Sequence, residues 1–237
     1  MKVGIMQPYF FPYIGYWQLI KEVDHFILLD EVQYIRHGWI NRNRILKENG
    51  GWKYVVLDIK SHPRQEKIRN IEILESVNAI DYLERHLTVY KKIATYYKEC
   101  LSLIRGIECL GDKRKITDIN ECVIKAISKY LGIGTTIYKS SDKSFDYSFV
   151  SGPGDWALEI TRQVGGNEYV NPISGRNLFD KSKFEKNHIK LSFINPLEIR
   201  YSQGREHFEP SLSIIDVLMF NGREKTKELL GAYEITG

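Results

Sequence analysis

The stretch that decides the fold reads Lys2-Val-Gly-Ile-Met-Gln7, a short apolar run that ends on an amide and is broken by a proline. A second run, His25-Phe-Ile-Leu-Leu29, ends on the acid Asp30. Residues 18–23 between them have a helical composition, so the segment predicts a β-α-β unit with parallel strands. Ligands of open α/β sheets bind beyond the carboxyl ends of the strands. We therefore expect a site where Gln7 and Asp30 follow their strands.

Outward from this unit, apolar runs and helical periodicity alternate along the chain. Further strands are predicted at residues 52–58, 68–74, 135–139, 168–170 and 189–194, the second of them as an edge strand. Helices are predicted at residues 79–106, 117–131, 154–164, 178–187 and 213–220. The predicted fold class is α/β, with a Rossmann-like, nucleotidyltransferase-like sheet that is mainly parallel. Residues 1–74 and 132–237 form the α/β domain and residues 75–131 a helical insertion, in one compact unit.

Composition places the chain among ordinary globular proteins. Of its 237 residues, 43% are hydrophobic and 27% charged, and 34 basic against 30 acidic residues give a net charge of +4. This excess is too small for the footprint of a DNA-binding domain, so no DNA partner is expected. The charge is uneven, however, because residues 36–47 hold four formal positive charges and a histidine without an acid. Such a run favours a phosphate or carboxylate partner.

Several features are not expected. No stretch approaches the roughly 20 apolar residues that span a bilayer, and the first apolar run is too short for a signal peptide, so we expect a cytoplasmic protein without a membrane partner.

The cysteines, Cys100, Cys109 and Cys122, are odd in number and lack CxxC spacing. They predict small buried hydrophobes and neither a disulfide nor a zinc site. No histidine pair has metal-ligand spacing, so no metal site is predicted.

The turn after the first strand is the first candidate site. Nucleotidyltransferase-like enzymes carry a His-x-Gly-His turn here that opens the next helix against the triphosphate of ATP, whereas this chain reads Tyr13-Ile-Gly15-Tyr16. Gly15 still suits a close backbone approach, and Tyr13 and Gly15 are predicted to bind substrate. The alternative is a purely structural cluster of the aromatic residues 9–17. Gln7 needs hydrogen-bond partners at its strand end and a ligand is a good candidate, so Gln7 is predicted to be catalytic.

The second candidate site is residues 30–44. Asp30 could act as a base or hold a ribose hydroxyl, and His37 is the best titrating group of the basic run, so both are predicted to be catalytic. Arginine side chains fork onto phosphate oxygens, and amides read neutral polar groups. The predicted substrate-binding residues of this segment are Gln33, Arg36, Asn41, Arg42 and Arg44. The alternative is a solvated basic loop.

Two later segments supply the remaining candidates. Ser174-Gly-Arg176-Asn177 resembles the loop that clamps ATP phosphates in the same superfamily, and pantothenate synthetase carries a similar Ser-Ser-Arg-Asn run. Ser174 and Arg176 are therefore predicted to bind substrate, with a simple turn and helix N-cap as the alternative. Gln203 is a further substrate-binding candidate in a segment, residues 201–216, that otherwise has structural character.

The longest motifs are Met6-Gln-Pro-Tyr-Phe-Phe-Pro-Tyr-Ile-Gly-Tyr16, Leu29-Asp-Glu-Val-Gln33 and Trp39-Ile-Asn-Arg-Asn-Arg-Ile45, together with residues 169–176 and 208–216. At these motifs, and over nearly its whole length, the chain resembles the WbqC-like family, which is found with bacterial surface-polysaccharide and O-antigen gene sets. One departure is Tyr169-Val-Asn-Pro172, in place of a Tyr-Leu-Ser-Gly-like run. It weakens a phosphate role for this loop.

The resemblance implies a place beside genes that make nucleotide-linked amino sugars. We therefore expect a transferase that forms an amide by acylating or aminoacylating such a sugar, for example by glycine transfer to dTDP-4-amino-4,6-dideoxyglucose. The donor could be an amino acid with Mg-ATP, by analogy with the acyl-adenylate of pantothenate synthetase, or a preactivated carrier such as aminoacyl-tRNA. The missing histidines argue against ATP. The alternatives are a sugar-nucleotide-binding protein without catalysis and a nucleotidyltransferase acting on a sugar phosphate.

Overall fold

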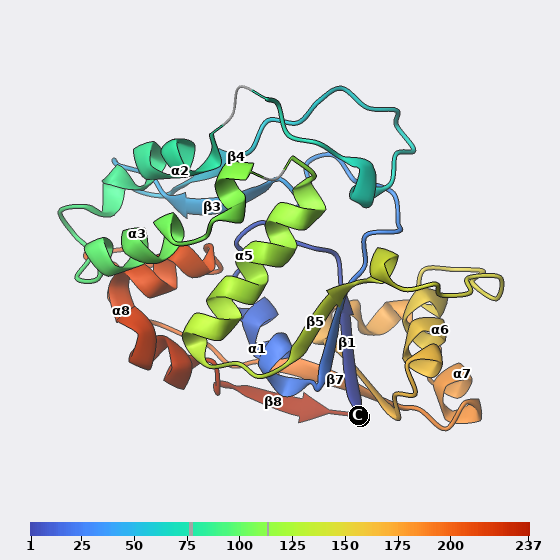
Figure 1. Ribbon diagram of the computed structural model, residues 1–237. Coiled ribbons are helices and arrows are strands. Elements are labelled where there is room, and N and C mark those ends of the chain that lie inside the picture. Colours follow the sequence, from blue (N-terminus) through green and yellow to red (C-terminus); the bar gives the residue numbers. More distant parts are fainter. Residues whose placement is uncertain (76–77, 113) are drawn as a thin grey trace.

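A six-stranded sheet forms the centre of the computed structural model, which describes residues 1–75, 78–112 and 114–237 (Figure 1). Its order is β5-β2-β1-β6-β7-β8, with β8 antiparallel and the other strands parallel. The strands are β1 (Lys2–Met6), β2 (His25–Leu28), β5 (Thr136–Lys139), β6 (Glu168–Pro172), β7 (Lys190–Pro196) and β8 (Tyr233–Thr236). Numbered along the chain within this sheet, the order is the 3-2-1-4-5-6 of dinucleotide-binding folds, and it reverses between β1 and β6. The expected Rossmann-like α/β fold is confirmed.

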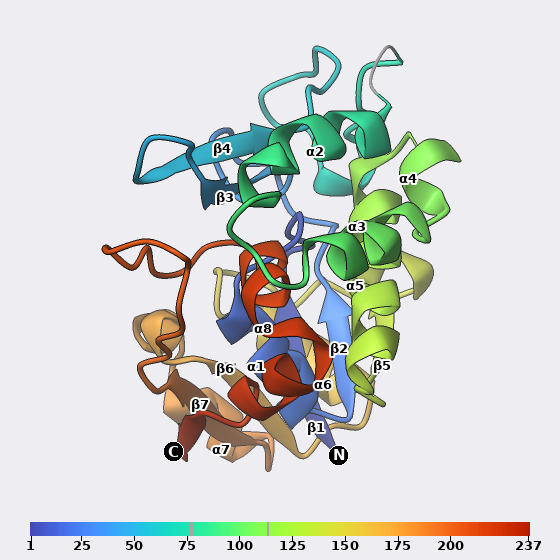
Figure 2. The same ribbon diagram turned by 90° about the vertical axis from the view of Figure 1, so that its left-hand side faces the viewer.

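Helices cover both faces of the sheet (Figures 1 and 2). One face carries α1 (Ile14–Glu22), α5 (Ile116–Leu131) and α8 (Ile214–Leu229), and the other carries α6 (Asp155–Gln163) and α7 (Lys181–Lys186). Alternate side chains of β2 pack on opposite faces of the sheet: Phe26 and Leu28 belong to one hydrophobic cluster and Ile27 to the other. A strand that is buried on both faces is apolar throughout, which is why the runs at residues 2–7 and 25–29 are continuous.

A second lobe lies beyond the carboxyl edge of the sheet (Figure 2). It contains an antiparallel hairpin, several short helices and the loops between them. These elements are β3 (Arg42–Leu46), β4 (Trp52–Val56), η1 (Ile68–Asn70), α2 (Ala79–Leu87), η2 (Thr88–Tyr90), α3 (Tyr97–Arg105) and α4 (Cys109–Asp112). One hydrophobic cluster runs from this lobe into α1, α5 and α8. The division into an α/β domain and an insertion at residues 75–131 stays a prediction.

Several expected elements differ in the structure. The strand at residues 52–58 exists as β4, but it pairs with β3 and not with the main sheet. Residues 68–74 form a 3-10 turn and isolated bridges and not an edge strand. The helix expected at 79–106 is interrupted, because the backbone N–H of Tyr96 donates to the carbonyl of Met219 in α8 (2.9 Å). Packing against α8 thus overrides a helical period in the sequence.

The end of the chain also departs from expectation. Gly222 does not terminate the last helix but kinks it, with φ 63°, and α8 resumes as far as Leu229. The kink lets the backbone pass the ring of Tyr96, which a Cβ on Gly222 would meet at 2.6 Å. The exposed strand β8 then follows.

The cysteine expectation needs a correction. Cys100 is buried and free, as a small hydrophobe should be, whereas Cys109 and Cys122 form a disulfide that joins α4 to α5. Helix α5 turns back along α4, and this brings the two Cα atoms to 6.4 Å although the residues are 13 apart in sequence. The spacing rule failed because the proximity comes from the helix–helix turn and not from a local CxxC motif.

Candidate functional site

The reversal of strand order between β1 and β6 opens a crevice, which we call the switch-point crevice. Its cavity measures about 260 Å³. Gln7 follows β1, Asn171 lies in β6, and Ser174 and Gly175 belong to the next turn, η4 (Ile173–Leu178). Ligands of doubly wound sheets bind at this place, because loops on the two sides of the reversal leave in opposite directions. The remaining lining residues are Ile5, Met6, Tyr9, Leu29, Pro153, Trp156, Ala157, Tyr169, Pro172, Leu178 and Phe179.

A second cavity continues the crevice toward the upper lobe. It measures about 570 Å³ and shares Gln7, Leu29, Pro153 and Trp156 with the first. Its other lining residues are Val32, Gln33, Ile35, Val150, Ser151 and Gly152. Because Gln7 borders both cavities, the two form one groove along the carboxyl edge of the sheet. The predicted residues Gln7, Gln33 and Ser174 therefore line the same groove.

Polar side chains of the crevice differ in how they are held. Asn171 is fixed, because its Oδ1 accepts from the Tyr169 hydroxyl (2.8 Å) and its Nδ2 donates to the Pro172 carbonyl (2.9 Å). A Cβ on Gly175 would lie 2.3 Å from Asn171 Nδ2, so only glycine lets η4 close onto this amide. By contrast, the side chains of Gln7 and Ser174 have no hydrogen-bond partner within the described ranges. They are free to bind a ligand.

The two crevice cavities carry no acidic, basic or histidine side chain among the described residues. Gly152 and Pro153, which line the groove, lead directly into the N-terminus of α6. The Asp155 carboxylate secures this turn by accepting from the N–H groups of Ser151 and Gly152 (3.1 and 3.0 Å). A bond from Lys183 lowers the Asp155 pKa to about 2. The groove thus combines neutral hydrogen-bonding groups with the N-terminus of α6, where the Asp155 carboxylate pairs with Lys183.

A smaller cavity of about 250 Å³, which we call the aromatic pocket, joins the crevice at Tyr9. Tyr9, Tyr13, Trp39, Asn43, Arg44 and Ser211 line it. Burial, with the neighbouring Tyr13 adding to it, raises the pKa of Tyr9, and burial also raises the pKa of Tyr13. Both hydroxyls therefore remain neutral at physiological pH and can donate hydrogen bonds to a ligand.

The walls of the aromatic pocket come from opposite ends of the chain. Asn43 of β3 donates from Nδ2 to the carbonyls of Phe10 and Phe11 (2.9 Å each). Ser213, the N-cap of α8, donates from Oγ to the Phe11 carbonyl (2.8 Å) and from its N–H to the Arg44 carbonyl (2.9 Å). Residues 10–13 are thus fixed between β3 and the start of α8, and this packing covers the entry to α1.

Gly15 has a local reason to be glycine. A Cβ at this position would lie 2.5 Å from the ring of Tyr13, so the close approach is made by that ring. Gly15 itself is buried in the first turn of α1 and lines none of the cavities described above, whereas Tyr13 lines the aromatic pocket.

Three of the predicted basic residues, Arg36, His37 and Arg42, line a further cavity of about 360 Å³, the cationic pocket, whereas Arg44 lines the aromatic pocket. Its lining residues are Tyr34, Arg36, His37, Asn41, Arg42, Val56, Ile59, Lys60, Ser61 and His62. Asn41 forms the floor, since it accepts from the Tyr34 hydroxyl (2.8 Å) and donates to the Leu57 carbonyl (2.9 Å). Lys60 pairs with two glutamates, while Arg36 and Arg42 form no ion pair in the described part of the chain.

Arg42 is held in place by its surroundings. Its Nε donates to the Gly38 carbonyl (3.1 Å), one terminal nitrogen donates to the His37 carbonyl, and its guanidinium lies 4.1 Å above the Tyr54 ring. His37 adopts φ 63°, which is uncommon for a residue with a side chain and aims its carbonyl at Arg42. The geometry gives His37 a backbone role in positioning Arg42, and its exposed imidazole borders the cationic pocket.

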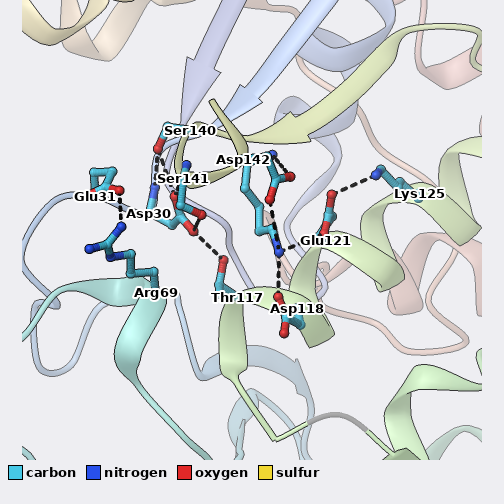
Figure 3. Close-up of polar contacts among 11 residues, drawn as sticks. Asp30, Glu31, Arg69, Thr117, Asp118, Glu121, Lys125, Ser140, Ser141 and Asp142 are labelled. Atoms are coloured by element: carbon cyan, nitrogen blue, oxygen red, sulfur yellow. Dashed lines mark hydrogen bonds and ion pairs between the residues drawn. The ribbon is translucent and has the colours of Figure 1, made fainter. Parts of the chain in front are cut away.

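Asp30, unlike Gln7, is enclosed by protein hydrogen-bond donors, and Figure 3 shows this network around its carboxylate. It is fully buried, and its carboxylate accepts from the hydroxyl of Ser140 (2.9 Å), from the N–H and hydroxyl of Ser141 (3.0 and 2.7 Å), and from the Thr117 hydroxyl (3.3 Å). It lines none of the cavities described above. We interpret Asp30 as a structural link from the end of β2 to η3 (Ser140–Asp142) and the first turn of α5.

Gln203 and Arg176 also lie outside the crevice. Gln203 is buried, donates to the Glu209 carbonyl (3.0 Å) and to Asp216 Oδ2 (2.8 Å), and accepts from the Glu209 N–H (2.7 Å). This is a structural arrangement, because every polar atom of its amide has a protein partner. Arg176 is exposed, and its guanidinium lies 5.6 Å from the Phe193 ring.

Sequence reasoning missed part of the site. Tyr9, Trp39, Trp156 and Ser211 line its cavities and were not among the predicted residues. Tyr9 and Trp39 fall inside the first and third motifs of the chain, so their place in those motifs was an available signal. Ser211 likewise falls inside the motif at residues 208–216, whereas Trp156 lies in none of the motifs, because only the fold brings α6 to this edge.

The comparisons with known proteins agree with the motifs. The model of the WbqC-like protein family matches residues 7–228. The chain belongs to the WbqC-like family. An uncharacterized protein of Mycobacterium tuberculosis (strain ATCC 25618 / H37Rv), Rv1507c, is 31% identical over 228 residues, which cover 94% of this chain and 95% of that protein. No solved structure matches the chain. Within the described residues, no helix combines the length and apolar character needed to cross a bilayer.

Proposed function

We propose that this WbqC-like protein is a transferase that acylates or aminoacylates the amine of a nucleotide-linked amino sugar, such as dTDP-4-amino-4,6-dideoxyglucose. The observation that carries the proposal is the switch-point crevice beside the N-terminus of α6. Its uncharged side chains Gln7 and Ser174 have no hydrogen-bond partner among the residues that the structure describes. Amides and hydroxyls suit the hydroxyls and amine of a sugar, and a helix N-terminus suits a diphosphate.

In this proposal the sugar amine lies against Gln7 and the sugar ring against Trp156 and Ser174. The carbonyl oxygen of Gln7 accepts from the amine and so directs its lone pair toward the donor. The Tyr9 hydroxyl is protonated at physiological pH, and burial raises its pKa further. It donates to the carbonyl oxygen of the donor as charge develops there. Tyr9 is suited to this position because it borders both the crevice and the aromatic pocket.

The chemical step is aminolysis of an activated acyl group. The amine nitrogen attacks the acyl carbonyl carbon, a C–N bond forms, and the bond from that carbon to the leaving group breaks. The leaving group departs with the electron pair and takes one proton from the amine. Since no carboxylate, lysine or histidine of the described residues lines the two crevice cavities, catalysis here depends on positioning and on carbonyl polarisation.

The donor is therefore proposed to arrive already activated. A triphosphate would need an open helix N-terminus at Tyr13-Ile-Gly15-Tyr16, and that turn is covered by Ser213 and packed by the Tyr13 ring. Arg176, the expected phosphate clamp, lies against Phe193. The residues present thus do not fit ATP, and no step is assigned to it.

The test incubates the protein with dTDP-4-amino-4,6-dideoxyglucose and one donor at a time: glycine with Mg-ATP, glycyl-tRNA, or an acyl thioester. Mass spectrometry of the sugar nucleotide should show the addition of one acyl group with an activated donor. Gln7→Ala should lower the rate about tenfold, whereas Gln65→Ala, which removes an exposed loop amide, should not. No mass gain with any donor would refute the proposal.

One observation favours a second candidate function. A crevice without an acidic or basic side chain also suits a protein that holds a sugar nucleotide without changing it. Such a protein would bind the sugar nucleotide in a Gln7-dependent manner, measured by isothermal titration calorimetry, and would give no product with any donor. A nucleotidyltransferase would instead release pyrophosphate from a nucleoside triphosphate and a sugar phosphate.

A further inference from the structure

The outer face of the β3–β4 hairpin carries guanidinium groups and aromatic rings in alternation. The register places Arg44 opposite Tyr54, and Arg42 and Trp52, each two residues away along its own strand, share their face. Arg44 lies 5.1 Å from the Trp52 ring and 5.5 Å from the Trp39 ring. Trp52 and Tyr54 are 5.0 Å apart, and Trp39 and Tyr54 are 6.3 Å apart. With Arg42 above Tyr54, we call these five residues the hairpin stripe.

The stripe connects the pockets of the upper lobe to the crevice. At one end, Arg42 lines the cationic pocket together with Arg36. At the other end, Trp39 and Arg44 line the aromatic pocket, which meets the switch-point crevice at Tyr9. A ligand bound along the stripe therefore reaches the proposed reaction centre with one end. The rest of the ligand contacts the arginines of the stripe.

Among the described residues, no carboxylate pairs with the two arginines of the stripe or with Arg36, which adjoins Arg42 in the cationic pocket. Arg36, Arg42 and Arg44 form no ion pair in the parts of the chain that the structure describes, whereas nearby Lys60 pairs with Glu72 (3.0 Å). One terminal nitrogen of Arg44 donates a hydrogen bond to the Ser211 carbonyl (3.0 Å). The buried Nε of Arg44 has no acceptor among the described residues. A buried donor without an acceptor is costly, and an oxygen of a bound phosphate would satisfy it.

Several stacking surfaces with cations between them are the arrangement that binds single-stranded nucleic acids, because the bases stack on the rings while the phosphates meet the cations. A carrier with a single phosphate cluster would use only one of the pockets. We infer that the hairpin stripe binds the single-stranded 3′ end of an RNA, and that the acyl donor is an aminoacyl-tRNA. The inference rests on the proposed function, since it names the donor of that transfer.

The chemistry fits the uncharged crevice. The aminoacyl group is an ester of the terminal ribose, so the sugar amine attacks the ester carbonyl, the new C–N bond forms and the C–O bond to the ribose breaks. The ribose oxygen leaves with the electron pair and takes the proton that the amine loses. Because the ribose supplies this proton acceptor, the crevice needs no acidic or basic side chain.

Fluorescence anisotropy with a labelled 12-nucleotide single-stranded RNA ending in CCA tests the stripe directly. Trp52→Ala should weaken binding about tenfold without changing the salt dependence, because it removes a stacking surface and no charge. Arg36→Ala should reduce the slope of log affinity against log salt by about 0.7, the value of one phosphate contact in a single strand. Arg44→Lys keeps the charge and should still weaken binding, since lysine lacks the planar fork.

The matched control is Lys186→Ala, which removes one exposed positive charge from α7 at the opposite end of the molecule (Figure 1). It should leave both affinity and salt slope unchanged, and thermal unfolding should show that every variant is folded. Equal RNA affinity of the wild type, Trp52→Ala and Arg36→Ala would overturn the inference. So would product from an acyl thioester but not from glycyl-tRNA, a result that would leave the proposed sugar acylation standing. If the protein bound RNA through the stripe but did not acylate the sugar with any donor, the proposed function would be refuted instead.

Discussion

The ends of β1 and β2 lie side by side at the same edge of the sheet, yet they carry opposite kinds of polar residue. The two strands pair in parallel up to Met6 and Leu28, and the N–H of Leu29 donates to the Met6 carbonyl (2.8 Å). After β1, the Gln7 amide borders two cavities and has no hydrogen-bond partner in the described part of the chain. After β2, the Asp30 carboxylate is fully buried under donors from three residues. One strand end is open and its neighbour is closed.

The difference shows that the carboxyl end of a strand marks where a site can form and not which residue belongs to it. Asp30 is closed because Thr117, Ser140 and Ser141 arrive from segments more than 85 residues away in sequence. Gln7 is open because the strand order reverses between β1 and β6. The segments that follow these two strands therefore turn away from each other and leave the crevice between them. Substitutions on the two sides should therefore affect different properties.

The largest expected effect is on stability, at the closed end. Asp30→Ala should lower the free energy of unfolding by about 4 kcal/mol, because it leaves buried donors without an acceptor. For a chain of this size the unfolding midpoint should fall by about 8–16 °C, measured by differential scanning calorimetry. If Asp30 were instead a catalytic base, the variant would lose turnover while keeping its unfolding temperature.

A second closed carboxylate predicts a dependence on pH. Burial raises the pKa of Asp216 to about 6, although hydrogen bonds from Tyr201, Tyr90 and Gln203 oppose the shift. The folded state therefore binds this proton more tightly than the unfolded chain, whose aspartate titrates near 4. Stability from this group is complete below pH 4 and is lost as pH rises through 6, by up to about 3 kcal/mol.

Urea unfolding between pH 4 and pH 7 measures this loss. Asp216→Asn should remove it, so the difference between the two proteins isolates the titration of one group. Parallel pH curves for the wild type and the variant would contradict the assignment.

The open end should respond in binding and not in stability. Gln7→Ala should weaken the affinity for a nucleotide-linked amino sugar about tenfold, equivalent to about 1.4 kcal/mol. Its unfolding free energy should stay within about 0.5 kcal/mol of the wild type, since no protein hydrogen bond is lost. Isothermal titration calorimetry and urea unfolding together decide between the two outcomes. A large loss of stability would mean that the amide is structural.

The smallest effect is expected for one donor of the closed end. Ser141→Ala removes one hydroxyl from Asp30 but leaves the Ser141 N–H and the Ser140 hydroxyl bonded. The expected cost is about 1 kcal/mol, seen as a shift of the urea midpoint at constant slope. A cost as large as that of Asp30→Ala would show that the network acts as a single unit.

The sequence was a good guide where burial sets the pattern. The strands expected near residues 2–7, 25–29, 135–139, 168–170 and 189–194 appear as five neighbours of one sheet. The continuous apolar runs of β1 and β2 follow from burial on both faces. It failed at β3, where Asn41-Arg-Asn-Arg44 looked like a polar loop. There Asn43 faces inward and bonds the carbonyls of Phe10 and Phe11, so a polar residue occupies an interior strand position.

The candidate site was recovered only in part, for a related reason. Gln7 and Ser174 could be placed at the crevice because both follow strands. Asp30 and Gln203 carry the same local signals, and nothing in their own segments reveals the distant donors and acceptors that enclose them. Tertiary contacts decide whether a polar group is available to a ligand, and the residues next to it in the sequence do not reveal those contacts.

The interlocking of residues 10–13 with Ser213 has a consequence for biosynthesis. The aromatic pocket is bounded by Tyr9 near one end of the chain and by Ser211 near the other. At roughly 5–20 residues per second, a ribosome needs about 10–40 s to travel between them. The first strands can collapse during that time, but the pocket has no far wall until the last helix emerges. A nascent chain therefore cannot form the complete aromatic pocket, and a ligand that needs this pocket binds only after residues 211–213 have been synthesised.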